Sequence, residues 1–112
     1  MLKETYYNQY KGWGTIIPED AIQINVMRTH GSILSPSYSL LNDWKDKKIS
    51  WDNYTKRFIE EIQSNPEALK YMEQIKELSK IKDVYLICAC YNKKKQCHRF
   101  ILIEMINNLD NY

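Results

Sequence analysis

The feature that most constrains the fold of this chain is the apolar segment from Val84 to Ala89, which precedes a basic turn and a second apolar stretch. The segment shows no alternation of apolar and polar residues, and this is typical of a strand covered on both faces in a parallel sheet flanked by helices. The stretch from about Cys97 or His98 to Leu109 is predicted to be the last helix. A strand, a turn and a helix therefore meet at Cys97, His98 and Arg99.

Two further strands are predicted in the N-terminal third. Residues 3–12 mix tyrosines with polar groups and are assigned to a first strand, which the KGWG sequence at Lys11 to Gly14 interrupts. In residues 22–27 apolar and polar positions alternate, as expected for a half-buried strand. That strand brings Arg28 and His30 to its C-terminal end.

Three helices are predicted between this strand and Val84. Ser35 is placed to cap the first and Pro36 suits its first position. Ser50 caps the second, whose apolar residues have helical spacing. The pair Asn65 and Pro66 repeats the cap-then-proline pattern, and the third helix runs to about Ser79. Strands separated by helices predict an α/β fold, with a small, mostly parallel sheet flanked by helices in one domain spanning residues 1–112.

Composition limits the class of function. A chain of 112 residues is long enough for one domain. Its net charge of +2 is far from that of a general nucleic-acid binder, so a nucleic-acid partner is not favoured. The apolar run from Val84 to Tyr91 is too short to span a bilayer, and MLKETYYNQY at the N-terminus does not have the apolar core expected of a signal peptide. Three cysteines form no even framework, which favours reduced thiols and a cytoplasmic location.

The predicted strand end is the first candidate for a site. In open α/β sheets ligands collect beyond the carboxyl ends of the strands, where Cys88 and Cys97 are expected to face the same crevice. The N-terminus of the last helix attracts anions, and Lys93 to Lys95 and Arg99 add positive charge. The lysine run alone is also consistent with a solvated turn. Together these features point to phosphate, carboxylate or another anion.

Two arginines and two histidines complete the candidate set. Arg99 offers a guanidinium fork for phosphate, and His98 can donate, accept or transfer a proton. Both residues are equally consistent with structural hydrogen bonds to carbonyls at strand ends. Arg28 and His30 line the same crevice if the two strands are neighbours, although His30 taken on its own is better explained as a loop histidine without a function.

Catalysis and metal binding are the alternatives at these residues. Cys97 at a helix N-terminus beside His98 is a candidate nucleophile, but the sequence has neither a Cys-His-Asn arrangement nor a C-x5-R loop, and an inert packing role is the other interpretation. Cys88, Cys90, Cys97 and His98 form C-x-C-x6-C-H, which departs from the paired spacing of zinc sites. We therefore expect no metal and no cofactor.

The chain resembles the domain of unknown function 488 family, whose small α/β members have no established activity. The resemblance rests on LSPSYSLLNDWK at Leu34 to Lys45, on WDNYTKRFIEEI at Trp51 to Ile62, and chiefly on VYLICACYNKKKQCHRFILIEMI at Val84 to Ile106. In the family a strand ends in a cysteine and a C-H-R triplet opens the next helix, and Arg28 matches an arginine often found after the second strand. Cys90 stands where the family commonly has an acidic residue, which shifts the expectation from catalysis towards binding.

The function expected from these observations is binding of a small anionic ligand, of nucleotide or phosphorylated type, at the N-terminus of the last helix. The expected ligand-binding residues are Arg28, His30, Cys88, Cys97, His98 and Arg99. Aromatic side chains are expected to stack on a base. The alternatives are an enzyme acting on a nucleotide or nucleic acid through His98 and Cys97, and a protein-interaction or inhibitor module. A homo-oligomer is compatible with each alternative.

Overall fold

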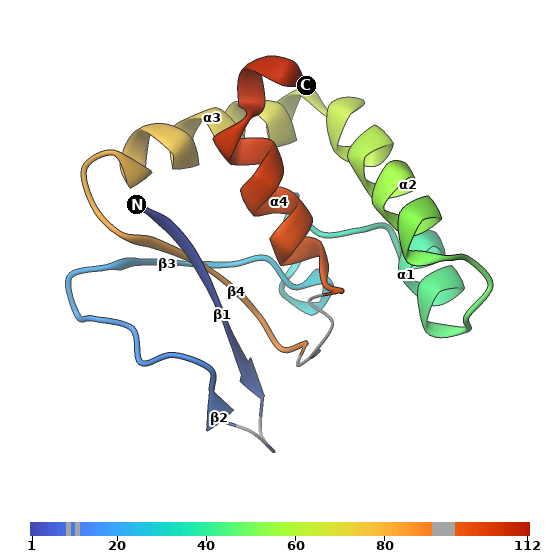
Figure 1. Cartoon of the computed structure of the whole chain (residues 1–112), viewed down its shortest axis with the longest axis horizontal. Coiled ribbons are helices and arrows are strands. Elements are labelled where there is room, and N and C mark those ends of the chain that lie inside the picture. The colour runs from blue at the N-terminus through green and yellow to red at the C-terminus, as the bar shows by residue number, and fades with distance from the viewer. Residues whose placement is uncertain (9, 11, 91–95) are drawn as a thin grey trace.

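A computed structural model describes residues 1–8, 10, 12–90 and 96–112 of the chain. Within these residues, four strands form one sheet in the order β2-β1-β4-β3 (Figure 1). They are β1 (Leu2–Asn8), β2 (Gly12–Trp13), β3 (Ile22–Asn25) and β4 (Val84–Cys88). β4 pairs in parallel with β1 on one side and with β3 on the other, and β2 adds a short antiparallel edge to β1. This confirms the predicted α/β fold with a mostly parallel sheet.

The central strand β4 is buried along its whole length, as its apolar sequence predicts. Val84, Leu86 and Cys88 belong to the hydrophobic core that the helices share. Tyr85 and Ile87 alternate with them and face the other side of the sheet. The strand therefore buries side chains on both faces, which explains why its sequence shows no period of two.

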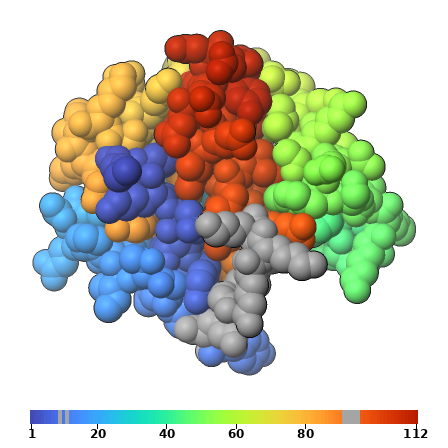
Figure 2. Space-filling view, in the orientation of Figure 1, coloured from blue at the N-terminus to red at the C-terminus, as the bar shows by residue number. Residues whose placement is uncertain are grey.

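In the part of the chain that the structure describes, four α-helices supply most of the remaining core. They are α1 (Tyr38–Lys45), α2 (Trp51–Gln63), α3 (Pro66–Ser79) and α4 (His98–Asn107), and the 3-10 helices η1 (Arg28–His30) and η2 (Leu109–Asn111) are shorter. The space-filling view shows α4 as a central ridge between α3 and β1 on one side and α1 and α2 on the other (Figure 2). The core cluster includes Phe58, Met72 and Leu102, one residue from each of α2, α3 and α4, so the three helices share one apolar interior.

The helix caps confirm two predictions and correct one. Ser50 accepts a hydrogen bond from the backbone N–H of Asn53, and Asn65 caps α3 with Pro66 at its first position. The predicted cap Ser35 is wrong, because its backbone N–H bonds to the carbonyl of Ser32 in a turn. The cap of α1 is Ser37, two residues later, and the helix begins at Tyr38.

The segment after β3 also differs from the prediction. The predicted strand over residues 22–27 ends at Asn25, and Arg28 to His30 form η1. Gly31 ends η1 with a φ of 70°, a left-handed conformation that favours glycine. The first strand is likewise shorter than residues 3–12, because β1 ends at Asn8. Among the described residues, no helix combines the length and apolar composition that a membrane span needs.

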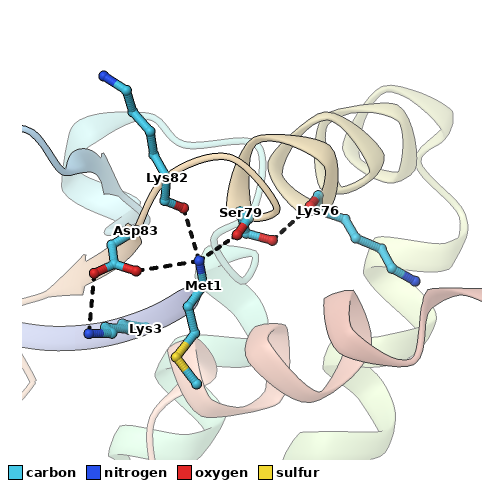
Figure 3. A network of polar contacts seen from close by, with 6 residues as sticks. All are labelled: Met1, Lys3, Lys76, Ser79, Lys82 and Asp83. Atoms are coloured by element: carbon cyan, nitrogen blue, oxygen red, sulfur yellow. Dashed lines mark hydrogen bonds and ion pairs between the residues drawn. The ribbon is translucent and has the colours of Figure 1, made fainter.

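The backbone ammonium of Met1 joins the start of β1 to the end of α3. It donates hydrogen bonds to the carbonyls of Ser79 and Lys82 and lies 3.4 Å from a carboxylate oxygen of Asp83 (Figure 3). Lys3 lies 3.3 Å from the other oxygen of Asp83, and its hydrogen bond lowers the pKa of this carboxyl. These contacts hold β1 beside the beginning of β4.

Candidate functional site

A pocket of about 420 Å³ lies at the carboxyl end of β4, where α4 begins and η1 follows β3. Its described wall combines apolar side chains of α1 and α2 with thiols, an imidazole and the cations Arg28 and Lys45. The described lining residues are Met27, Arg28, Thr29, Pro36, Leu41, Trp44, Lys45, Tyr54, Cys88, Ala89, Cys90, Gln96, Cys97 and His98. This cavity therefore lies where the ends of two strands, the N-terminus of α4 and the segment after β3 meet. Open α/β sheets typically bind ligands at such a place.

Three thiols gather at the inner wall of this pocket. Cys88 ends β4, Cys97 is the N-cap of α4, and Cys90 follows the strand; all three are free. A hydrogen bond with the Cys97 thiol lowers the pKa of Cys88 to about 6, and the positive charge of Arg99 acts in the same direction. The Cys97 thiol also lowers the pKa of Cys90 to about 7.

Cys97 is the neutral member of this cluster. Its hydrogen bonds to Cys88 and Cys90 raise its pKa above the ordinary thiol value, and burial adds to the increase. Cys97 therefore acts as the proton donor towards the other two sulfurs. This arrangement favours Cys88 over Cys97 as the more reactive thiol, because the thiolate is the nucleophilic form.

His98 is fixed by a backbone carbonyl. Its Nε2 lies 2.6 Å from the carbonyl oxygen of Val26, the residue after β3, and its Nδ1 lies 3.7 Å from Cys97 Sγ. A carbonyl oxygen only accepts, so Nε2 carries the proton and Nδ1 keeps its lone pair. Burial lowers the pKa of His98 to about 4, which keeps the ring neutral near pH 7. The ring also packs edge-on against Phe58.

Arg99 lies behind the pocket and is almost fully buried, with 3% of its side chain exposed. Its Nε donates to a carboxylate oxygen of Glu4 in β1 at 2.6 Å, and one terminal nitrogen donates to the Cys90 carbonyl at 2.7 Å. Its guanidinium also lies 4.5 Å from the ring centroid of Phe100. Arg99 and His98 thus make hydrogen bonds to backbone carbonyls near strand ends. This is the structural role predicted from the sequence as the alternative to ligand binding.

Arg28 is the arginine that lines the pocket itself. Its Nε is buried and has no hydrogen-bond partner among the described residues, and its guanidinium carbon lies 5.1 Å from the ring centroid of Tyr38. A buried N–H donor without a partner is costly. Arg28 therefore has a donor to offer to a ligand in this pocket.

A second, larger pocket of about 740 Å³ adjoins the first on the other face of the sheet. The two pockets share Met27, Thr29 and Ala89 in their walls. The wall of the larger one is aromatic and polar. Its remaining described residues are Tyr7, Asn8, Tyr10, Trp13, Gln23, Asn25, His30 and Ile87.

The structure brings together four of the six predicted site residues. Arg28, Cys88, Cys97 and His98 line the smaller pocket, whereas His30 lines the larger one. The pockets adjoin because β3 and β4 are neighbours, as the strand-end argument assumed. The sixth, Arg99, is bonded to Glu4 and Cys90 behind them.

Sequence reasoning did not find Lys45 and Tyr54, which also line the smaller pocket. Both looked like ordinary positions on amphipathic helices, and only the packing of α1 and α2 beside β4 brings them to the cavity. The predicted basic run at Lys93 to Lys95 lies outside the described residues.

A family model described as the active DUF488-N3 subclade matches residues 15–109. The matched segment contains every predicted site residue, from Arg28 to Arg99, and begins after β1 and β2. Comparison with curated proteins and with solved structures found no match.

Proposed function

The chain belongs to the DUF488 family, and on that premise we propose that it binds a small anionic ligand, of nucleotide or phosphorylated type, in the pocket at the end of β4. The observation that carries the proposal is the buried Nε of Arg28 in the pocket wall, which has no hydrogen-bond partner among the described residues. The described residues of this wall include the cations Arg28 and Lys45 and no carboxylate. A phosphate oxygen would give the buried Nε of Arg28 the acceptor that it lacks among the described residues.

The N-terminus of α4 adds to this attraction. Cys97 caps the helix without a side-chain hydrogen bond, and the first backbone N–H groups of α4 carry the positive end of the helix dipole. In this proposal Arg28 and Lys45 contact the anion directly. His98 and Arg99 hold the thiols and the helix start in place through Val26, Glu4 and Cys90.

The larger pocket supports a nucleotide over a simple anion. The rings of Tyr7 and Trp13 lie 4.8 Å apart, both are about half exposed, and both line that pocket. Gln23 and Asn25 add side-chain amides, which can hydrogen-bond to the edge of a base. Stacking of a base on an aromatic side chain stabilises a complex by about 1–3 kcal/mol. A nucleotide would then place its base in the larger pocket and its phosphate in the smaller one.

The test is thermal unfolding of the protein with a panel of nucleoside mono-, di- and triphosphates, inorganic phosphate and uncharged nucleosides. A ligand present at 100 times its Kd stabilises the folded state by about 2.7 kcal/mol, which corresponds to an increase in Tm of roughly 10 °C for a domain of this size. We expect phosphorylated members of the panel to raise Tm and uncharged nucleosides to have little effect. Stabilisation by no phosphorylated ligand at millimolar concentration would contradict the proposal.

Matched variants assign the binding to this pocket. Arg28→Met and Lys45→Met should each weaken binding of the phosphorylated ligand, whereas Lys70→Met removes the same charge from an exposed position of α3 and should not. Trp13→Ala should weaken nucleotide binding and leave binding of inorganic phosphate unchanged. Equal losses in the Arg28 and Lys70 variants would show that net charge, and not the pocket, attracts the ligand.

An enzyme acting on the same ligand is the second candidate. The description of the matching family model calls the subclade active. The thiols of Cys88, Cys90 and Cys97 line the pocket and are the groups on which such chemistry would depend. Chromatography of each stabilising nucleotide after incubation with the protein tests this candidate, with Cys88→Ser as the control. Unchanged nucleotide would leave binding as the function.

We further propose that the protein works in the cytoplasm, because all three cysteines are free thiols, which reducing compartments maintain. The tendency to form a homo-oligomer stays a prediction. Light scattering with and without the ligand measures it directly.

A further inference from the structure

We propose that Cys88, Cys97 and His98 form a binding site for one thiophilic divalent cation of the zinc class. Their ligand atoms, two sulfurs and one ring nitrogen, all lie within 4.8 Å of one another. All three residues are buried, with 5–7% of their surface exposed. This site is independent of the anion-binding proposal, because it rests on the ligand atoms alone and needs no nucleotide.

The spacing of the atoms fits a tetrahedral ion. Zn–S bonds of about 2.3 Å and Zn–N bonds of about 2.0 Å place sulfur and nitrogen ligands roughly 3.5 Å apart in a tetrahedron. The distance from Cys97 Sγ to His98 Nδ1 is 3.7 Å. An ion would therefore enter with little movement of these two side chains.

The orientation of His98 is the second support. Its Nε2 donates to the Val26 carbonyl, so the lone pair is on Nδ1, the nitrogen that faces Cys97. Histidines that bind metals typically donate their other ring N–H to a carbonyl or carboxylate, which fixes the tautomer and the ring orientation. The Val26 carbonyl at 2.6 Å provides this second contact.

The fold overcomes the unfavourable sequence spacing. C-x-C-x6-C-H predicts no zinc site, because Cys88 and Cys90 are too close along the chain to act as the usual pair. In the structure the paired ligands come from different elements: Cys88 ends β4, whereas Cys97 and His98 open α4. Both elements are buried in the core, which makes the ligand set rigid.

The set provides three protein ligands, and the fourth position would face the smaller pocket, whose wall contains all three. Sites with three protein ligands and one open position are typical of ions that bind a water molecule or a substrate. Cys90 also lines the pocket but is not among the atoms within 4.8 Å. We therefore assign it no bond to the ion.

Cobalt(II) titration of the reduced full-length protein, purified without a histidine tag and treated with a chelator, tests the site. Tetrahedral cobalt with thiolate ligands gives intense visible bands and a near-ultraviolet charge-transfer band. We expect both to saturate at one equivalent and to disappear when zinc displaces the cobalt. Absence of a saturable band at micromolar metal would overturn the proposal.

Three variants identify the ligands. Cys88→Ser and Cys97→Ser should each lose about half of the charge-transfer intensity and weaken binding by more than the 10- to 100-fold that loss of an outer contact costs. Cys90→Ser removes a thiol from the same wall and should keep one equivalent of cobalt with an unchanged spectrum. Circular dichroism of each metal-free variant checks that it is folded. If Cys90→Ser loses as much as Cys88→Ser, the assignment of these three ligands is wrong.

Discussion

The ion pair between Arg99 and Glu4 offers the sharpest test of what holds the site together. It joins the first turn of α4 to β1 through two residues that are 95 positions apart in the chain. The Arg99 side chain is 3% exposed and that of Glu4 is 32% exposed. The perturbation is a double-mutant cycle with Glu4→Gln and Arg99→Met.

The magnitude follows from the unequal burial of the partners. Removing one member of a fully buried ion pair costs about 3–5 kcal/mol, because the other charge remains unpaired. Water already reaches Glu4, and glutamine keeps one acceptor oxygen, so Glu4→Gln should cost about 2 kcal/mol. Arg99→Met should cost a similar amount, because the Cys90 carbonyl loses its donor while Glu4 can regain water.

The two substitutions should not add. Once Arg99 is gone, no buried charge needs Glu4, so the double variant should be about as stable as Arg99→Met alone, with a coupling energy of about 2 kcal/mol. Urea unfolding followed by circular dichroism measures all four free energies of unfolding, with the m-value as a check on two-state behaviour. A Glu4→Gln cost below about 0.5 kcal/mol, or additive effects, would refute the reasoning.

Three further predictions concern the caps, the turn and the pH dependence. Ser37→Ala should lower the free energy of unfolding in urea by about 2 kcal/mol, because Ser37 both caps α1 and donates to a Glu61 oxygen at 2.6 Å. Ser50→Ala removes a cap alone and should cost about 1 kcal/mol. Equal costs for the two variants would argue against the Glu61 contact. Gly31→Ala should lower the free energy of unfolding by about 1 kcal/mol, since alanine resists the left-handed φ of 70°, and an unchanged Tm would contradict this. The Lys3 hydrogen bond lowers the pKa of Asp83, so the stability from this pair is present above about pH 3.9 and is lost as the pH falls through the lower folded value. Asp83→Asn should remove this part of the acid dependence, and an unaltered pH profile of unfolding would speak against it.

The sequence predicts best where a local signal and the tertiary structure agree. Asn65 and Pro66 mark the start of α3, and the apolar spacing carries the helix to Ser79, where it ends. At Ser35 and Pro36 the same signal fails, because Ser35 bonds to Ser32 in a turn. The N-cap of the helix is Ser37, two residues later. Ser37, and not Ser35, caps α1, and its additional hydrogen bond to Glu61 in α2 favours this choice.

The candidate site could be predicted in outline, because the strand-end rule depends only on chain order. Cys88 and Cys97 come to one pocket as soon as a parallel strand leads into a helix. The protonation of the thiols could not be predicted, because it depends on sulfurs and on the Arg99 charge meeting in space. The role of Arg99 was equally hidden, because its partner Glu4 lies in a strand that is distant in sequence.

The strand order has a consequence for the synthesis of the protein. β1 and β3 leave the ribosome early, yet each forms its parallel pairing with β4, which is made after all three crossover helices. Until residue 88 has emerged from the ribosome, the nascent chain contains β1 and β3 but not β4, the strand that lies between them. Such non-local pairing is slow to form, so the exposed edges of β1 and β3 would benefit from a chaperone during translation.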